Sequence, residues 1–86
     1  MTEEELLIKV KTGLGITHSF QDETIRLYIE DVKAFMISAG VSQMIVNSEF
    51  SVGCILRGVA DLYNFGSGNT KFSPYFLQRV QQLKKE

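Results

Sequence analysis

The chain has few of the residues that usually carry chemistry. It contains one cysteine, one histidine and one proline in 86 residues, and its formal net charge is −1. A single cysteine excludes an intramolecular disulfide, so we expect a reducing, cytoplasmic setting rather than secretion. The near-neutral charge gives no field that would attract phosphate backbones, which argues against non-specific binding to nucleic acid. The sequence shows neither the pattern of a signal peptide nor an apolar run that could span a membrane, so we expect no membrane partner.

The scarce reactive residues do not form a recognisable site. His18 falls in a predicted turn and Cys54 is far from it, which gives no support for a metal cluster or a Cys-His nucleophile pair. Asp61 and Tyr63 have no second carboxylate or histidine at a supporting spacing, and we expect Asp61 to make a helix-end hydrogen bond. The segment Gly66-Ser-Gly-Asn-Thr-Lys71 lacks the residue order of a phosphate-binding loop. We therefore predict that the protein is not an enzyme and has no catalytic residue, metal, cofactor or small-molecule ligand.

Helix start and stop signals, in contrast, are abundant. Thr2 with Glu5 fits a capping box, glycines after residue 12 and at position 40 end two apolar periodic runs, and Ser73-Pro74 suits the first positions of a new helix. Ser19 and Ser48 are candidate N-caps for the second and third helices. Apolar residues recur at steps of three and four between these signals. The predicted helices cover about residues 3–13, 20–39, 49–64 and 74–85.

The remaining segments connect these helices. Residues 41–47 are apolar but short and irregular, so we expect a packed connection with local strand character. Residues 65–72 are rich in glycine and polar residues, and we expect a flexible loop. A chain of this length buries only about 60 to 65% of the surface that its unfolded form exposes, which allows one core. The prediction is an all-α protein, a compact bundle of four helices that forms a single domain over residues 1–86.

Several large apolar residues fall outside the stripes that would face this core. Ile8, Leu27 and Ile37 lie off the main stripe of their helices when each residue advances by 100°, and Tyr75 is a further candidate on the last helix. Scattered exposed aliphatic residues are ordinary on proteins, so no single one of them requires a partner. The same excess on more than one helix favours a second buried surface, and we predict self-association through these residues.

The third predicted helix carries a band of small side chains opposite its apolar stripe. Ser51, Cys54, Gly58 and Asp61 share this face, where another helix could approach closely. An exposed glycine in a helix costs about 1 kcal/mol relative to alanine, which a neighbour packed on Gly58 would explain, although a merely tolerated glycine would look the same. We therefore include Cys54 and Gly58 among the predicted subunit contacts.

The order of these motifs resembles the phage head-tail connector family. The opening Leu6-Leu-Ile-Lys-Val-Lys-Thr-Gly-Leu-Gly-Ile-Thr17 is similar to the family's first helix and its exit. Asp22-Glu23, followed by an amphipathic run to Ala39-Gly40-Val41, resembles the second helix. Asp61-Leu-Tyr-Asn64, the glycine-rich turn and Phe72-Ser-Pro-Tyr75 resemble the remainder.

The resemblance implies a structural role in phage assembly. Connectors of this kind form a ring of identical subunits, here a dodecamer matched to the portal protein, and complete the head beneath it. They also contact a further head-completion or tail protein, and DNA passes through the ring without sequence-specific binding. The implied location is the host cytoplasm during assembly and then the virion. The residues expected to contact portal or tail proteins are Phe65, Lys71, Phe72, Tyr75, Arg79, Lys84 and Lys85.

A small helical DNA-binding regulator is the competing function class. It would share the length and helix count of this chain, but its recognition helix needs basic and amide side chains on an exposed face. The third predicted helix offers only Arg57, whereas the fourth combines Gln78, Arg79, Gln81 and Gln82. The last helix therefore keeps this alternative open.

Overall fold

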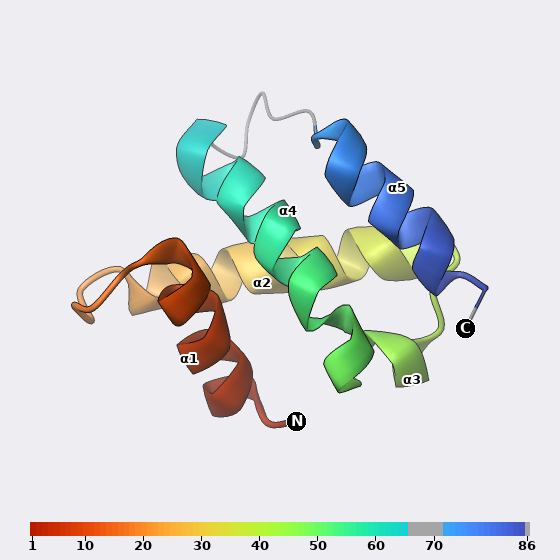
Figure 1. The fold of residues 1–86 in the computed structure, drawn as a ribbon. Coiled ribbons are helices and arrows are strands. Elements are labelled where there is room, and N and C mark those ends of the chain that lie inside the picture. The colour runs from red at the N-terminus through yellow and green to blue at the C-terminus, as the bar shows by residue number, and fades with distance from the viewer. Residues whose placement is uncertain (66–71, 86) are drawn as a thin grey trace.

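A single long helix, α2, forms one layer of the structure, and three other helices form the second. The computed structural model describes residues 1–65 and 72–85, except the side chain of Phe65. In Figure 1, α2 crosses behind α1, α4 and α5, and α4 lies between the other two. The helices are α1 (Glu3–Leu14), α2 (Asp22–Ser38), α3 (Gln43–Val46), the 3-10 helix η1 (Glu49–Ser51), α4 (Val52–Phe65) and α5 (Pro74–Leu83).

The all-α fold with four long helices is confirmed, and residues 1–65 and 72–85 contain no strand. The predicted flexible loop at 65–72 lies mostly outside the described residues. None of the helices among the described residues is long and apolar enough to cross a membrane.

The core forms where α4 contacts α1, α2 and α5. Because α4 has neighbours on three sides, its side chains are buried around most of its circumference. Its apolar positions meet the inner faces of the other helices, and the space is filled mainly by branched aliphatic residues. The fully buried residues of largest volume are Phe76, Leu6, Ile25, Met36 and Ile55.

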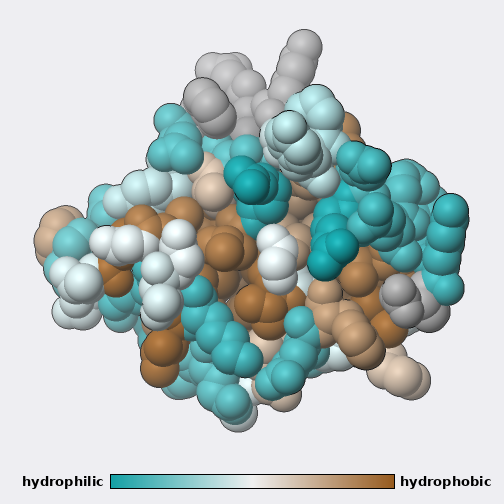
Figure 2. All heavy atoms as spheres, viewed as in Figure 1, coloured by the Kyte–Doolittle hydropathy of each residue, from teal (hydrophilic) through white to brown (hydrophobic). Residues whose placement is uncertain are grey.

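The molecule is thin in one direction. Its extents are 36 × 29 × 17 Å, and the smallest corresponds to about two helix diameters. Each helix therefore has a face that no other part of the described chain covers. Figure 2 shows the face formed by α1, α4 and α5, with apolar residues between α1 and α4 and hydrophilic residues over α5.

The predicted caps of the first and last helices are present. Thr2 Oγ1 accepts a hydrogen bond from Glu5 N, and Thr2 N donates to Glu5 Oε1, both over 3.1 Å, which completes the capping box. Ser73 Oγ accepts from Phe76 N, with proline at the first helical position. The first helix ends at Gly15, whose φ of 74° is the left-handed conformation that glycine adopts without steric cost.

Three local predictions are wrong. The N-cap of α2 is Gln21, which makes no side-chain capping bond, while Ser19 only supplies a backbone oxygen to Asp22 N. The connection at 41–47 has no strand character, because Ser42 caps the short helix α3 by accepting a hydrogen bond from Ile45 N. Ser48 precedes η1 but its hydroxyl donates to Ile45 O instead of capping the next helix.

Candidate functional site

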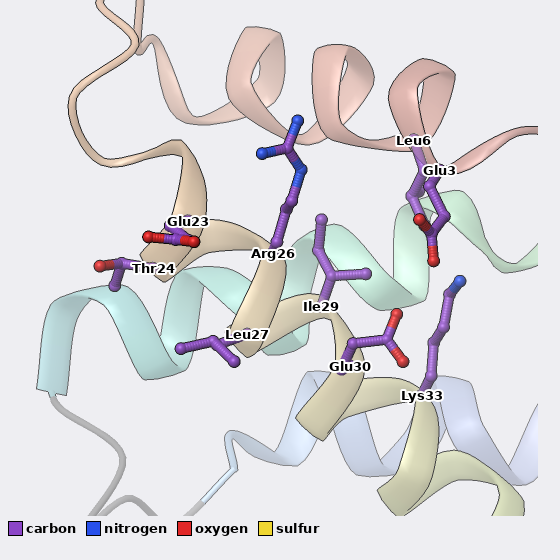
Figure 3. A pocket seen from close by; sticks show the side chains of 9 residues that line it. All are labelled: Glu3, Leu6, Glu23, Thr24, Arg26, Leu27, Ile29, Glu30 and Lys33. Atoms are coloured by element: carbon purple, nitrogen blue, oxygen red, sulfur yellow. The ribbon is translucent and has the colours of Figure 1, made fainter.

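An open groove lies between α1 and α2. Its volume is about 410 Å³. Leu6 and Ile29 are buried at its base, whereas Leu27 lines it and stays 65% exposed. Figure 3 shows that the groove lies on the side of α2 that faces away from α4. Leu6 and Ile29 belong to the core of the protein, so Leu27 is the apolar side chain that this groove leaves exposed.

The rim of this α1–α2 groove is predominantly acidic. Three carboxylates, those of Glu3, Glu23 and Glu30, line it together with the cations Arg26 and Lys33. Arg26 Nη2 is already paired with Glu4 Oε1 at 2.7 Å, so its charge is largely compensated within the protein.

A second groove, of about 330 Å³, lies between α4 and α5 and has the opposite charge. Arg57 and Arg79 line it with Tyr75, and no acidic residue does. The Arg57 guanidinium carbon lies 5.9 Å from the centre of the Tyr75 ring, which is cation-π distance. Arg79 Nη1 donates to Gln82 Oε1 over 3.0 Å.

The two arginines keep their charge available. The ion pairs formed within residues 1–65 and 72–85 are Lys9–Glu49, Lys11–Asp22 and Arg26–Glu4. Neither Arg57 nor Arg79 belongs to any of them. The α4–α5 groove is therefore a basic surface with an exposed aromatic side chain, and it suits an acidic partner.

The prediction that Cys54 and Gly58 contact another subunit is wrong. Both are buried inside the protein, as are Ser51 and Asp61 on the same face. A Cβ on Gly58 would lie 2.7 Å from Phe76 Cε1 and 2.8 Å from Val32 Cγ1. Neighbouring helices do approach this band closely, but they are α5 and α2 of the same chain.

The environment of Cys54 also excludes a reactive thiol. The side chain is fully buried, and this desolvation raises the pKa of the thiol to about 11, against a smaller opposing effect of Arg79. At neutral pH the group is therefore protonated and a poor nucleophile.

Ile8, Leu27 and Ile37 are all exposed, with 61%, 65% and 46% of their surface accessible. They remain candidates for contacts between copies. Other exposed apolar side chains could not be predicted from the helical pattern. They lie in turns or in helices too short to show a regular apolar stripe. These are Phe20, Met44 and Phe50. Leu77, which the apolar pattern of residues 74–85 predicts to face the core, is also exposed.

The predicted portal and tail contacts divide into three groups. Phe72 is half-buried, and its ring packs at an angle against those of Phe35 and Phe76 with centroids 4.9 and 4.4 Å away, so it packs against the core. The side chain of Phe65, and all of Lys71, lie outside the described residues. The exposed members of the set are Tyr75, Arg79, Lys84 and Lys85.

The residues considered for chemistry have structural partners instead. Asp61 Oδ2 accepts a hydrogen bond from Ser73 N, and Tyr63 donates to Gln21 Oε1. The ring of His18 stacks on Phe20 with centroids 3.8 Å apart. Among the described residues, no three His, Cys, Asp or Glu side chains are grouped so that they could hold a metal ion.

These features define a small all-α protein whose candidate functional surfaces are two grooves of opposite charge. No family model, curated protein or solved structure matches the chain.

Proposed function

We propose that the protein is a phage head-tail connector, a structural protein that assembles as a ring beneath the portal and forms part of the DNA conduit. The proposal starts from the order of sequence motifs, above all Asp61-Leu-Tyr-Asn64 and Phe72-Ser-Pro-Tyr75. These motifs have clear structural roles here, since Asp61 binds the backbone at Ser73 where α5 begins. A chain of this type acts first in the host cytoplasm and then within the virion.

The observation that carries the proposal is the amount of apolar surface left exposed on so thin a molecule. Large apolar side chains are exposed on α1, α2 and α5 and on the shorter elements between the helices. A single exposed apolar side chain needs no partner, but the number of them on so small a chain supports a protein that is covered by partners. Ile8, Leu27 and Ile37 are assigned to contacts between copies, which bury this surface when the ring forms.

The end of α5 is assigned to the portal or to a tail protein. Lys84 and Lys85 are exposed in its last turn and beyond it, where they can meet an acidic surface. The net charge of −1 suits a conduit, because a strongly basic ring would hold DNA too tightly to let it slide.

Electron microscopy of the purified protein, alone and mixed with portal protein, tests this function. We expect rings, or density added beneath the portal, with the portal serving as a template where the free protein stays monomeric. Particles that remain monomeric in both samples and leave the portal unchanged would contradict the proposal.

A variant with Ile8→Gln and Ile37→Gln tests the assignment of the apolar surface. We expect fewer rings, while the free energy of unfolding changes by less than about 0.5 kcal/mol for each exposed substitution. Unchanged ring formation would remove these two residues from the interface.

The alternative, a small helical DNA-binding regulator, is favoured by one observation. Arg57 from α4 lines the same groove as Gln78, Arg79 and Gln82 from α5, and arginine and glutamine are the side chains that most often contact bases. A gel-shift experiment at low salt tests it, since electrostatic binding to DNA is then strongest. The absence of a shift with any duplex would exclude this class.

A further inference from the structure

The two grooves complement each other in charge. The α1–α2 groove has Glu23 and Glu30 on its rim, and neither forms an ion pair within the described residues. The α4–α5 groove presents Arg57 and Arg79, which are equally unpaired there, and no acidic residue lines it. Carboxylates and guanidinium groups form the strongest charged hydrogen bonds between protein side chains.

They also complement each other in shape and polarity. Tyr75 stands at the α4–α5 groove with 74% of its surface exposed, held beside Arg57. The α1–α2 groove offers an apolar base with the exposed Leu27, in a volume that accommodates an aromatic ring. Tyrosine and arginine are the side chains most often found at the energetic centre of protein interfaces.

We propose that the α4–α5 surface of one copy docks onto the α1–α2 groove of the next copy, with Tyr75 against Leu27 and with Arg57 and Arg79 facing Glu23 and Glu30. This inference names the contact by which the self-assembly in the proposed function takes place, and so it rests on that function. It also changes the role of Tyr75 and Arg79, which the sequence assigned to the portal or tail.

The positions of the two grooves determine the kind of assembly. Ile55 and Val59 of α4 are buried, whereas Gly53 and Arg57 are exposed on its outer side, away from α2. The α1–α2 groove opens on the opposite side, where α2 has no neighbour (Figure 3). One copy therefore cannot bind itself, and a second copy binds head to tail. Such contacts produce a ring where the rotation between copies closes and a filament where it does not.

A second copy fits the basic groove better than nucleic acid does. The protein as a whole carries a net charge of −1, which weakens attraction to a phosphate backbone. A second copy brings both the acidic rim and the apolar base that Tyr75 needs, whereas a phosphate backbone brings only charge.

Charge exchange tests the contact directly. In Arg57→Gln/Arg79→Gln we expect the dissociation constant for self-association, measured by sedimentation over a wide concentration range, to rise by about tenfold or more. The reversal Arg57→Glu/Arg79→Glu is expected to abolish association. Adding Glu23→Arg and Glu30→Arg to that reversal restores the net charge and is expected to restore association.

The matched control is Gln43→Glu/Gln81→Glu. Both residues are exposed and line neither groove, and the pair lowers the net charge by the same amount as Arg57→Gln/Arg79→Gln. This control is expected to associate as the natural protein does. Thermal unfolding of every variant shows whether the substituted chains still fold.

A cross-linking experiment detects the contact even where association is weak. In the double variant Leu27→Cys/Tyr75→Cys, head-to-tail contacts bring position 75 of one copy next to position 27 of the next copy. Oxidation is therefore expected to give a ladder of disulfide-linked dimers, trimers and larger species. Either single variant can form only dimers. The natural Cys54 is fully buried and does not contribute while the protein is folded.

The outcomes separate this inference from the proposed function. Portal-bound rings that are unaffected by the charge reversals, with no ladder, would overturn the inference and leave the connector function standing. The absence of both rings and ladder would overturn both. A DNA shift that depends on Arg57 and Arg79, with self-association unchanged, would overturn the inference in favour of the DNA-binding alternative.

Discussion

The carboxylate of Asp61 on α4 accepts a hydrogen bond from the backbone N–H of Ser73, the N-cap of α5, over 2.9 Å. Asp61 is only 7% exposed, so this bond is shielded from water. It fixes the start of α5 against the end of α4, and the two helices form the basic groove. The geometry of that groove therefore depends on a residue that does not line it.

Replacing Asp61 by alanine is expected to lower the free energy of unfolding by about 1–3 kcal/mol, because the Ser73 N–H is left without its partner. Urea unfolding measures the loss. The matched control is Asp31→Ala on α2, an exposed position that is expected to change stability by less than about 0.5 kcal/mol. Equal losses for the two variants would show that the bond adds nothing beyond the charge.

Two glycines of α4 are expected to respond to alanine in opposite directions. In Gly58→Ala the new methyl group meets Val32 and Phe76 at less than 3 Å, and overpacking of this kind costs about 1–3 kcal/mol. Val32 is β-branched and rigid in a helix, so it cannot move aside easily. The expected net result is destabilisation, in spite of the better helix propensity of alanine.

The control for this substitution is Gly53→Ala, where the new methyl group has nothing within 4 Å. Only the helix propensity changes there, and we expect stabilisation by about 0.5–1 kcal/mol. Thermal or urea unfolding compares the pair. A stabilised Gly58→Ala variant would mean that α5 does not pack closely on α4.

The thiol of Cys54 is expected to be inert in the folded protein. Burial raises its pKa to about 11, which leaves almost no thiolate at neutral pH, and no part of the side chain is accessible. Reaction with a colourimetric thiol reagent is therefore expected to be slow in buffer and fast in urea. Rapid labelling of the native protein would contradict the burial of this face of α4.

The capping box predicts a pH dependence of stability. The Thr2 backbone N–H that donates to the Glu5 carboxylate, helped by the Thr2 side chain, holds the pKa of Glu5 below its usual value of 4.5. The folded protein binds this proton less readily than the unfolded chain does. The Glu5 carboxylate therefore contributes its full stabilisation above pH 4.5. This stabilisation is lost as the pH falls through the lower pKa that Glu5 has in the folded protein.

The Glu5→Gln variant isolates this contribution, because glutamine keeps the shape of the cap and does not titrate. The melting temperature of the natural protein is expected to exceed that of the variant above pH 4.5, and the difference is expected to shrink in more acidic buffer. A difference that stays constant with pH would exclude the proposed role of the Glu5 charge.

The local signals in the sequence located most of the helices. Thr2 with Glu5 and Ser73 with Pro74 act through neighbours in the chain, so the bonds they make follow from spacing alone. The Ser19 side chain does not cap α2, because the Ser19 backbone oxygen accepts a hydrogen bond from Asp22 N in a turn and α2 begins only at Asp22.

The faces of α4 could not be assigned from the sequence in the same way. The helical wheel gave this helix one buried stripe, but three helices surround it, and the band with Cys54 and Gly58 faces the core as well. The basic groove was missed for a related reason. Arg57 and Arg79 are far apart in the chain, and only the packing of α5 on α4 brings them to one place.

The central position of α4 also determines which backbone amides are best protected from exchange with solvent. This helix contacts α1, α2 and α5, and among its described side chains only a narrow face with Gly53 and Arg57 is exposed. Backbone amides protected longest against exchange with deuterium therefore belong to α4, and their release reports the opening of the whole protein rather than the fraying of one edge.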